Sequence, residues 1–331
     1  MAREVNKNKL TIDRDLTKIN PENKLLLRDF ISYMRSIDRA ETTIYEYKKN
    51  LEGFFVYNMD NNRNKGFTEI TKRDFLRFQE HAMHTWKWSP SRIRGVKATI
   101  SSLSNYIENF LDEEYPGYHN VISNIVSPAL HSVLSNTVFT EDELQKLLDH
   151  LVENGRIRQA AALALAMYSG RRKSELTRFK VSHFKDENII YDSLWKTDEK
   201  IKTKGRGFHG KQIPLYVLKD KFKPYLDLLL EDRKKHGIKS EWLLTSYKFP
   251  GKQCSVDMLN DWADEFTKIL GKNFYWHSMR HYFTTMLIKQ NVPIDIIQDM
   301  VNWDSASMLR IYSDVSLDAN LGKFFAKKKI K

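Results

Sequence analysis

Five short segments in the second half of the chain carry residue types that suit chemistry at a phosphate. Guanidinium groups are permanently charged and can each donate two hydrogen bonds at once, so they suit an anionic transition state. Lysine and histidine can move protons, and a tyrosine hydroxyl can act as a nucleophile. Taken alone, each segment also has a structural interpretation, such as a helix start with surface arginines, a packing or metal-binding histidine pair, or a core tyrosine. The segments are SGRRKSEL (169–176), KTKGRGFHGKQIPL (202–215), HSMRH (277–281), NW (302–303) and RIYSD (310–314).

In this order the segments resemble the tyrosine recombinase (phage integrase) family, and in particular its Cre-like simple site-specific members. The resemblance is strong from about Phe139 to Tyr312 and weak over residues 20–115. It implies that Arg172 and Arg280 hold the non-bridging phosphate oxygens and that Tyr312 is the nucleophile. The implied reaction is DNA strand cleavage and rejoining through a 3′-phosphotyrosyl intermediate and a Holliday junction, without ATP, metal or any other cofactor.

The histidines and the tryptophan complete the implied site. His277 would accept the tyrosine proton or bind a phosphate oxygen, although it could also serve as a helix cap. His281 and Glu175 would be supporting residues, with Glu175 pairing with the Arg172 region. Trp303 stands where many members carry histidine, and its indole N–H can donate one hydrogen bond but cannot shuttle a proton. A purely packing role for Trp303 is the alternative.

A lysine on a β-hairpin would protonate the leaving 5′ oxygen. The resemblance assigns this general acid to Lys204, but Thr203 replaces the usual glycine before it and the hairpin is longer than the family pattern. Lys202 is the main rival, since residues two apart on a strand share a face. Lys211 follows on the returning strand.

The composition favours an acidic polymer as partner. The chain has 331 residues and a formal net charge of +12, and basic side chains release counterions when they meet phosphates. Arg92, Arg94 and Lys97 share one face of an expected helix. They are candidates for DNA contact, or else form a solvated face. Lys202 and Arg206 are further candidates for DNA contact. Arg171 is a third, and we interpret it as a residue that contacts the DNA backbone or lies on the surface.

Periodicity and scarce Gly and Pro predict a mainly α fold with a small antiparallel β-sheet. Helices are expected at 20–34, 41–57, 71–78, 90–110, 140–154, 158–168, 219–235, 256–270, 279–290, 294–300 and 305–312. A three-stranded antiparallel sheet is expected from apolar runs between Asn188 and Leu215.

Breaks in the pattern suggest the domain organisation. They separate a basic, polar N-terminal segment (1–19), a helical bundle (20–115), an interdomain linker (116–138) and an α+β domain (139–331). The family resemblance implies that 20–115 is a core-binding domain that contacts DNA and that 139–331 is the catalytic domain. It also implies a C-terminal exchange helix at about 317–327 that docks into a neighbouring protomer.

The resemblance further implies the partners, which are double-stranded DNA with an inverted-repeat recombination site and three further copies of the chain, giving a homotetramer on two DNA sites. The longest apolar run is too short for a membrane span, and no secretory signal is visible. The single Cys254 excludes an internal disulfide. A cytoplasmic protein encoded by a bacterium, phage or plasmid is expected. Two other functions stay open, a catalytically silent DNA-binding protein and a type IB topoisomerase.

Overall fold

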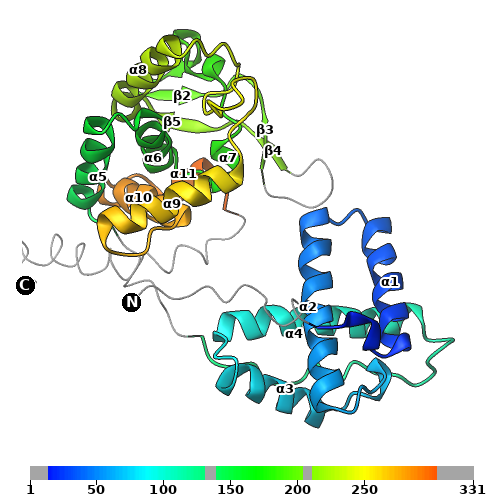
Figure 1. Cartoon of the computed structure of the whole chain (residues 1–331). Coiled ribbons are helices and arrows are strands. Elements are labelled where there is room, and N and C mark those ends of the chain that lie inside the picture. The colour runs from blue at the N-terminus through cyan, green and yellow to red at the C-terminus, as the bar shows by residue number, and fades with distance from the viewer. Residues whose placement is uncertain (1–13, 131–138, 204–210, 304–331) are drawn as a thin grey trace, which may run out of the picture. The chain divides into compact units, whose positions relative to one another are not determined.

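The computed structural model describes residues 14–130, 139–203 and 211–303, and the chain divides near residue 132 into two compact units (Figure 1). In its described residues the first unit consists of helices. They are η2 (Leu16–Lys18), α1 (Pro21–Ser36), α2 (Glu41–Asn61), η3 (Phe67–Glu69), α3 (Lys72–His84) and α4 (Pro90–Phe110).

The predicted starts of three of these helices are confirmed by their caps. The Asn20 side chain accepts a hydrogen bond from the Glu22 amide at 2.9 Å, and Pro21 occupies the first helical position of α1. Thr71 and Asp74 form the expected capping box of α3, and Ser89 caps α4. Each cap satisfies backbone amides that the first helical turn leaves without partners.

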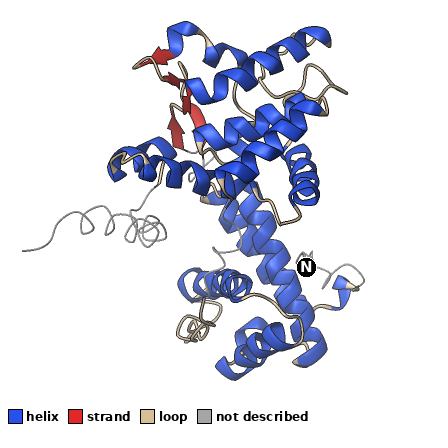
Figure 2. Ribbon diagram, turned by 90° about the vertical axis from the view of Figure 1, so that its left-hand side faces the viewer, coloured by secondary structure: helices blue, strands red, loops and turns tan. Residues whose placement is uncertain are grey.

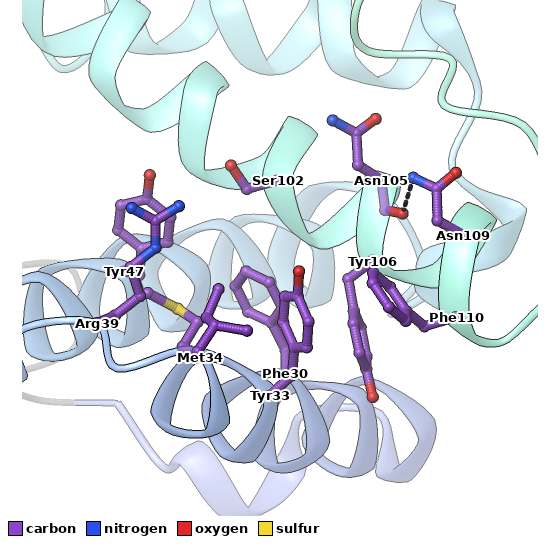
Figure 3. Close-up of a pocket in the computed structure, with 11 residues that line it drawn as sticks. Phe30, Tyr33, Met34, Arg39, Tyr47, Ser102, Asn105, Tyr106, Asn109 and Phe110 are labelled. Atoms are coloured by element: carbon purple, nitrogen blue, oxygen red, sulfur yellow. Dashed lines mark hydrogen bonds between the residues drawn. The ribbon is translucent and has the colours of Figure 1, made fainter. Parts of the chain in front are cut away.

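Aromatic rings fill much of the core of the first unit, where Phe54, Phe75 and Phe78 are almost fully buried. Between α1 and α4 lies a cavity of about 200 Å³ that is lined largely by aromatic and amide side chains (Figure 3). The rings of Tyr33 and Tyr106 meet there with centroids 5.0 Å apart. This cavity contains none of the predicted catalytic residues.

The chain after α4 folds back onto the same unit. Ile122 and Ile125 are 1 % and 7 % exposed and belong to its core. The first part of the segment expected as a linker therefore packs against the helices of the first unit.

The second unit combines helices with short strands (Figure 2). Its helices are α5 (Glu141–Glu153), α6 (Ile157–Ser169), α7 (Lys173–Leu176), η5 (Val181–Phe184), η6 (Asp186–Asn188), α8 (Lys219–Lys235), α9 (Val256–Leu270), α10 (Trp276–Lys289) and α11 (Ile294–Val301). Its strands are β1 (Ile189–Ile190), β2 (Leu194–Lys196), β3 (Ile201–Thr203), β4 (Lys211–Ile213) and β5 (Tyr216–Leu218).

Helix α6 forms the centre of the second unit, as its apolar sequence predicts. Every residue from Ala160 to Tyr168 is at most 5 % exposed. Helices α5, α8 and α10 pack around α6. The site residues on α7 and α10 therefore lie beside a rigid, fully packed helix.

The strands form two antiparallel sheets, where the sequence predicted one of three strands. One sheet has the order β1-β2-β5, and β3 pairs separately with β4. In the β3–β4 hairpin Ile201 faces Ile213 and Thr203 faces Lys211. The prediction placed Ile201 and Ile213 in the same sheet as Ile189, and it missed β2 and β5.

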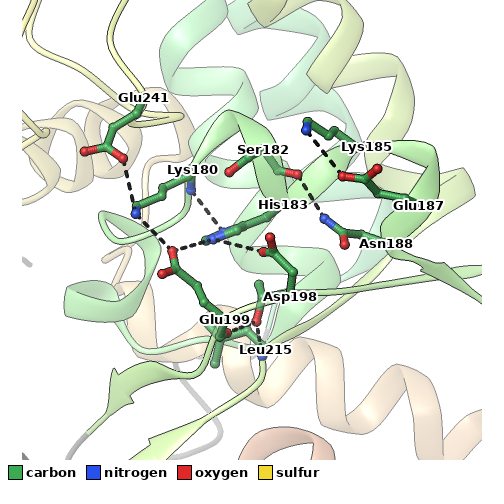
Figure 4. A network of polar contacts seen from close by, with 11 residues as sticks. Lys180, Ser182, His183, Lys185, Glu187, Asn188, Asp198, Glu199, Leu215 and Glu241 are labelled. Carbon is green, nitrogen blue, oxygen red and sulfur yellow. Dashed lines mark hydrogen bonds and ion pairs between the residues drawn. The ribbon is translucent and has the colours of Figure 1, made fainter.

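A network of charged side chains holds the turn between β2 and β3 (Figure 4). His183 is 1 % exposed, its Nδ1 accepts the Lys180 amide at 3.1 Å, and its Nε2 lies 3.0 Å from Glu199 Oε1. Lys180 Nζ is also within 3.1 Å of Glu199 and 3.2 Å of Glu241. We call Lys180, His183, Asp198, Glu199 and Glu241 the His183 network. It fixes the chain two residues before β3 begins.

One difference from the expected helices concerns the site. Helix α10 begins at Trp276, three residues earlier than predicted, so His277 lies in its first turn. The helix expected at 305–312 and the exchange helix lie outside the described residues. None of the described helices is long and apolar enough to cross a membrane.

Candidate active site

Arg280 of α10 joins three segments that are far apart in the sequence. Its Nη1 donates to the Gly170 carbonyl at 3.1 Å, and its Nη2 donates to the Val301 carbonyl. The Trp303 ring lies with its centroid 5.4 Å from the guanidinium carbon of Arg280. Arg280 is only 1 % exposed. It therefore holds the turn before Arg172 and the loop that carries Trp303 against α10.

The turn between α6 and α7 depends on a glycine. Gly170 ends α6 with a left-handed backbone, φ 60°. A Cβ at this position would lie 2.5 Å from the ring of Phe283 on α10. Glycine is therefore needed both for the backbone angle and for the close approach of the two segments.

Arg172 forms the ion pair that the sequence predicted. Its Nη1 lies 3.1 Å from Glu175 Oε1, and its own amide donates to Glu175 Oε2, also at 3.1 Å. The Glu175 side chain is 1 % exposed and that of Arg172 is 27 % exposed. One face of the Arg172 fork is thus held by a buried carboxylate, while part of the side chain still reaches solvent.

The expected surface position of Arg171 is wrong. Arg171 is 0 % exposed, and among the described residues none of its guanidinium nitrogens has a hydrogen-bond partner. Helix α7 begins only at Lys173, and the backbone at Arg172 is extended, so consecutive side chains there point to opposite sides. Burial lowers the pKa of Arg171 to about 10, and the group remains charged at neutral pH. The Arg171 side chain therefore has no exposed surface on which a DNA backbone could lie.

His277 and His281 lie one helical turn apart on α10, with ring centroids 4.7 Å apart. Burial, with added repulsion from Arg280 and Arg172, lowers the pKa of His277. Burial also lowers the pKa of His281 to about 4, with smaller contributions from His277 and Arg280. Although part of His277 faces solvent, this positive environment favours the neutral, proton-accepting form of the ring.

The loop after α11 reaches the β3–β4 hairpin. Asn302 caps α11 with a left-handed backbone, and its Nδ2 donates to Thr203 Oγ1 at 3.3 Å. Trp303, the next residue, is 7 % exposed. The end of strand β3 therefore lies beside the loop that Arg280 holds.

Lys202 lies on β3 with its side chain exposed, between the buried Ile201 and Thr203. Its carbonyl accepts a hydrogen bond from Arg178 Nη1, which follows α7. Lys204, Arg206 and Tyr312 lie outside the described residues. The structure thus brings together Arg172, Glu175, His277, Arg280, His281 and Trp303 beside the strand that leads to Lys204.

The basic residues of α4 are partly engaged within the first unit. Arg94 Nε donates to the Pro128 carbonyl at 2.9 Å, and Lys97 Nζ donates to the Ile125 carbonyl. Arg92 lies over the Trp88 ring at 5.0 Å. These contacts hold the segment after α4. They differ from the freely solvated helix face that was the alternative to DNA contact.

Sequence reasoning missed three residues of the site. Arg178 binds the backbone of β3, Asn302 contacts Thr203, and Lys173 Nζ lies 2.5 Å from Asn260 Oδ1 of α9. Lys173 and Asn302 lie inside the recognised segments SGRRKSEL and NW without a predicted role, and the partners of all three residues are distant in sequence. Only the packing of α7, α9, β3 and α11 reveals these contacts.

Comparison with known proteins agrees with this arrangement. Residues 137–318 match the model of the phage integrase family, a range that includes every predicted catalytic residue. The chain is 28% identical over 294 residues to the SPbeta prophage-derived recombinase-like protein YomM of Bacillus subtilis, covering 86% of this chain and 84% of that protein. It is 26% identical over 321 residues to a tyrosine recombinase of Thermosipho africanus, covering 92% and 98%.

The fold is similar to that of solved recombinases. The Tn1549 transposon integrase in complex with transposon right end DNA aligns with a TM-score of 0.66 at 16% identity, covering 91% of this chain and 99% of that one. The XerH site-specific recombinase bound to palindromic difH substrate aligns with a TM-score of 0.65 at 17% identity, covering 92% and 96%. Because the family match spans more than half of the sequence, the chain belongs to the phage integrase family and is a tyrosine-type site-specific DNA recombinase.

Proposed function

We propose that this recombinase cleaves and rejoins DNA through a covalent bond between Tyr312 and a 3′ phosphate. The observation that carries the proposal is the convergence of Arg172, His277, Arg280 and Trp303 from three separate segments. The tyrosine oxygen attacks phosphorus, the bond to the 5′ oxygen breaks, and the phosphotyrosyl bond retains the energy of the diester. Rejoining is the reverse attack by a 5′ hydroxyl, so the cycle needs no ATP.

Arg172 and Arg280 stabilise the charge that develops on the non-bridging oxygens. The partly exposed Arg172 fork is held on one side by Glu175 at 3.1 Å, which leaves further donors for a phosphate. A preorganised guanidinium of this kind lowers the barrier because it needs no reorientation during the reaction. The Trp303 indole N–H adds a neutral donor.

His277 accepts the proton that Tyr312 loses. Support comes from the lowered pKa of His277, which keeps the ring neutral at neutral pH. Lys204 donates the proton to the leaving 5′ oxygen. It directly follows β3, whose last residue contacts the loop that carries Trp303. Lys202, exposed on the same strand, is the alternative donor.

The functional assembly is a homotetramer on two DNA sites with inverted repeats, acting through a Holliday junction. The solved proteins of similar fold include a lambda integrase tetramer bound to a Holliday junction and XerH on a palindromic substrate. Each protomer would grip DNA with both units, residues 20–115 and 139–331 serving as core-binding and catalytic domains. Arg92, Arg94, Lys97 and Arg206 are the proposed contacts. The chain has a net charge of +12. Because basic side chains that contact phosphates release counterions, affinity for DNA falls steeply as the salt concentration increases.

A suicide substrate tests the proposal once the target site has been recovered by selection from a random or genomic library. In such a duplex a nick lets the cleaved fragment diffuse away, which traps the covalent intermediate. The wild type forms a protein–DNA adduct on a denaturing gel, and Tyr312→Phe forms none while still binding the site. An adduct that persists in Tyr312→Phe overturns the assignment.

The adduct gel and a plasmid-relaxation assay together separate the two alternatives. If the chain were a catalytically silent DNA-binding protein, the wild-type chain would bind the site but form no adduct. A type IB topoisomerase relaxes plasmids that lack any repeat, whereas the proposed recombinase acts only on plasmids that contain the selected site.

A further inference from the structure

A buried hydrogen-bond chain connects the loop of Trp303 to the β3–β4 hairpin. Asn302 Nδ2 donates to Thr203 Oγ1 at 3.3 Å, and Thr203 Oγ1 donates to the Lys211 carbonyl at 2.8 Å. Thr203 is 3 % exposed and Asn302 is 7 % exposed. Because the hydroxyl both accepts and donates, the two bonds polarise each other in the same direction.

Thr203 places these two hydrogen bonds directly before Lys204, the proposed general acid. Thr203 pairs with Lys211 at the end of the described ladder, and Lys204 is the next residue in the sequence. At this end of the β3–β4 hairpin the Thr203 hydroxyl donates to the Lys211 carbonyl, so a side-chain hydrogen bond adds to the backbone pairing of the two strands. Glycine, which the family pattern places at this position, could make neither bond.

Asn302 is held as firmly on the other side. Asparagine is among the few residues other than glycine that tolerate its left-handed backbone, φ 55° and ψ 65°. The Val301 carbonyl before it accepts from Arg280, and the Trp303 ring after it lies over the same guanidinium. The Asn302 amide is therefore fixed relative to an arginine of the site.

We infer that Thr203 and Asn302 are a positioning pair that holds the β3–β4 hairpin to the loop after α11, which Arg280 binds, and so fixes the residue directly before the proposed general acid, Lys204. The inference rests on the proposed function, in which Lys204 protonates the leaving 5′ oxygen. In this proposal the pair acts without contacting DNA or the reacting atoms. It acts by connecting the proton donor to the group that holds the phosphate.

The test compares two suicide substrates in single-turnover cleavage. One has the natural bridging 5′ oxygen, and the other has sulfur in its place. When the P–O bond breaks the oxygen needs a proton, whereas a thiolate leaves without one because thiols ionise readily. A defect that acts through proton donation is therefore relieved by sulfur, and a general folding defect is not.

Thr203→Val removes both bonds at nearly constant volume, and Asn302→Gly removes the amide while keeping the backbone conformation. Each is expected to slow cleavage of the oxygen substrate at least tenfold and to cleave the sulfur substrate at nearly the wild-type rate. The double variant should be no slower than the slower single variant, because both act through one contact. Thr203→Ser, which keeps the hydroxyl, should restore the rate on oxygen, and Asn302→Asp, which lacks the N–H, should not.

Two results overturn the inference. One is wild-type cleavage of the oxygen substrate by both Thr203→Val and Asn302→Gly. The other is an equal loss on oxygen and sulfur, which would show a structural role. Both results are measured against a wild type that forms the covalent adduct. If the proposed function itself fails, the wild type forms no adduct, so the two failures can be distinguished. Lys204→Ala, measured beside them, is relieved by sulfur only if Lys204 is the general acid.

Discussion

Two polar clusters of the second unit differ in how their charges are balanced. In the His183 network Lys180 lies within 3.2 Å of two carboxylates, and both ring nitrogens of His183 have partners. The second group, which we call the Arg280 cluster, consists of Arg172, Glu175, His277 and Arg280, and Glu175 is the one acidic member of this group.

The difference shows where the fold leaves room for a ligand. Balanced charges with complete hydrogen bonding stabilise a structure and need nothing further. A surplus of buried positive charge is unfavourable unless an anion completes it. The comparison therefore predicts that changes in the Arg280 cluster affect the reaction, whereas changes in the His183 network affect stability.

The largest effect is expected for Arg172→Ala. Loss of the partly exposed fork should reduce single-turnover cleavage by about 10²–10³-fold, the usual effect of losing one preorganised donor to a transition-state oxyanion. Arg172→Lys serves as control, because it keeps a cation beside Glu175 but lacks the planar fork. Both variants should bind DNA. The alanine variant leaves the buried Glu175 carboxylate without its ion-pair partner, so its stability should fall and cleavage is measured at low temperature, where it stays folded. A cleavage rate within threefold of wild type for the alanine variant would remove Arg172 from the site.

The matching change in the other cluster is His183→Leu. It leaves the Lys180 amide and the Glu199 carboxylate without their ring partners, and the free energy of unfolding should fall by about 1–3 kcal/mol. Denaturant unfolding measures the loss. The rate of cleavage by the folded protein should change less than threefold at low temperature. A rate loss as large as that of Arg172→Ala, with unchanged stability, would contradict the division between the clusters.

Arg171→Met tests the buried cation that precedes Arg172 of the Arg280 cluster in the sequence. Methionine removes a fully buried cation that lacks hydrogen-bond partners among the described residues and keeps an unbranched apolar side chain. The free energy of unfolding should rise by about 1–2 kcal/mol, within the range seen when buried charges are replaced. A decrease measured by the same denaturant method would mean that Arg171 is well solvated or paired. Arg171→Lys should give no increase.

The smallest effect concerns pH. His281 has a pKa near 6.5 in the unfolded chain and about 4 in the folded protein, so the unfolded state binds the extra proton between these values. Stability from this group is present above about pH 6.5 and is lost as pH falls toward 4, by about 1–2 kcal/mol after allowance for partial exposure. His281→Phe cannot bind the proton. Its melting temperature relative to wild type should therefore rise between pH 7 and pH 4.5, and a constant difference would contradict the lowered pKa.

Local signals predicted the helices well because caps and apolar spacing act within a few residues. Asn20-Pro21, the Thr71–Asp74 box and Ser89 mark helix starts that the structure confirms within one residue. The strands were harder to predict. They are two or three residues long, too short for an alternating pattern, and the partition into two sheets depends on long-range pairing.

For the candidate site, the sequence alone determined which residue types occur and in what order, and hence the family and its phosphate chemistry. The tertiary structure alone decided that Arg171 is buried while Arg172 next to it reaches solvent. It also decided that Asn302 meets Thr203 across 99 residues. The physical reason is that the surroundings of a side chain are supplied by segments packed from elsewhere in the chain, and no local pattern encodes which segments those will be.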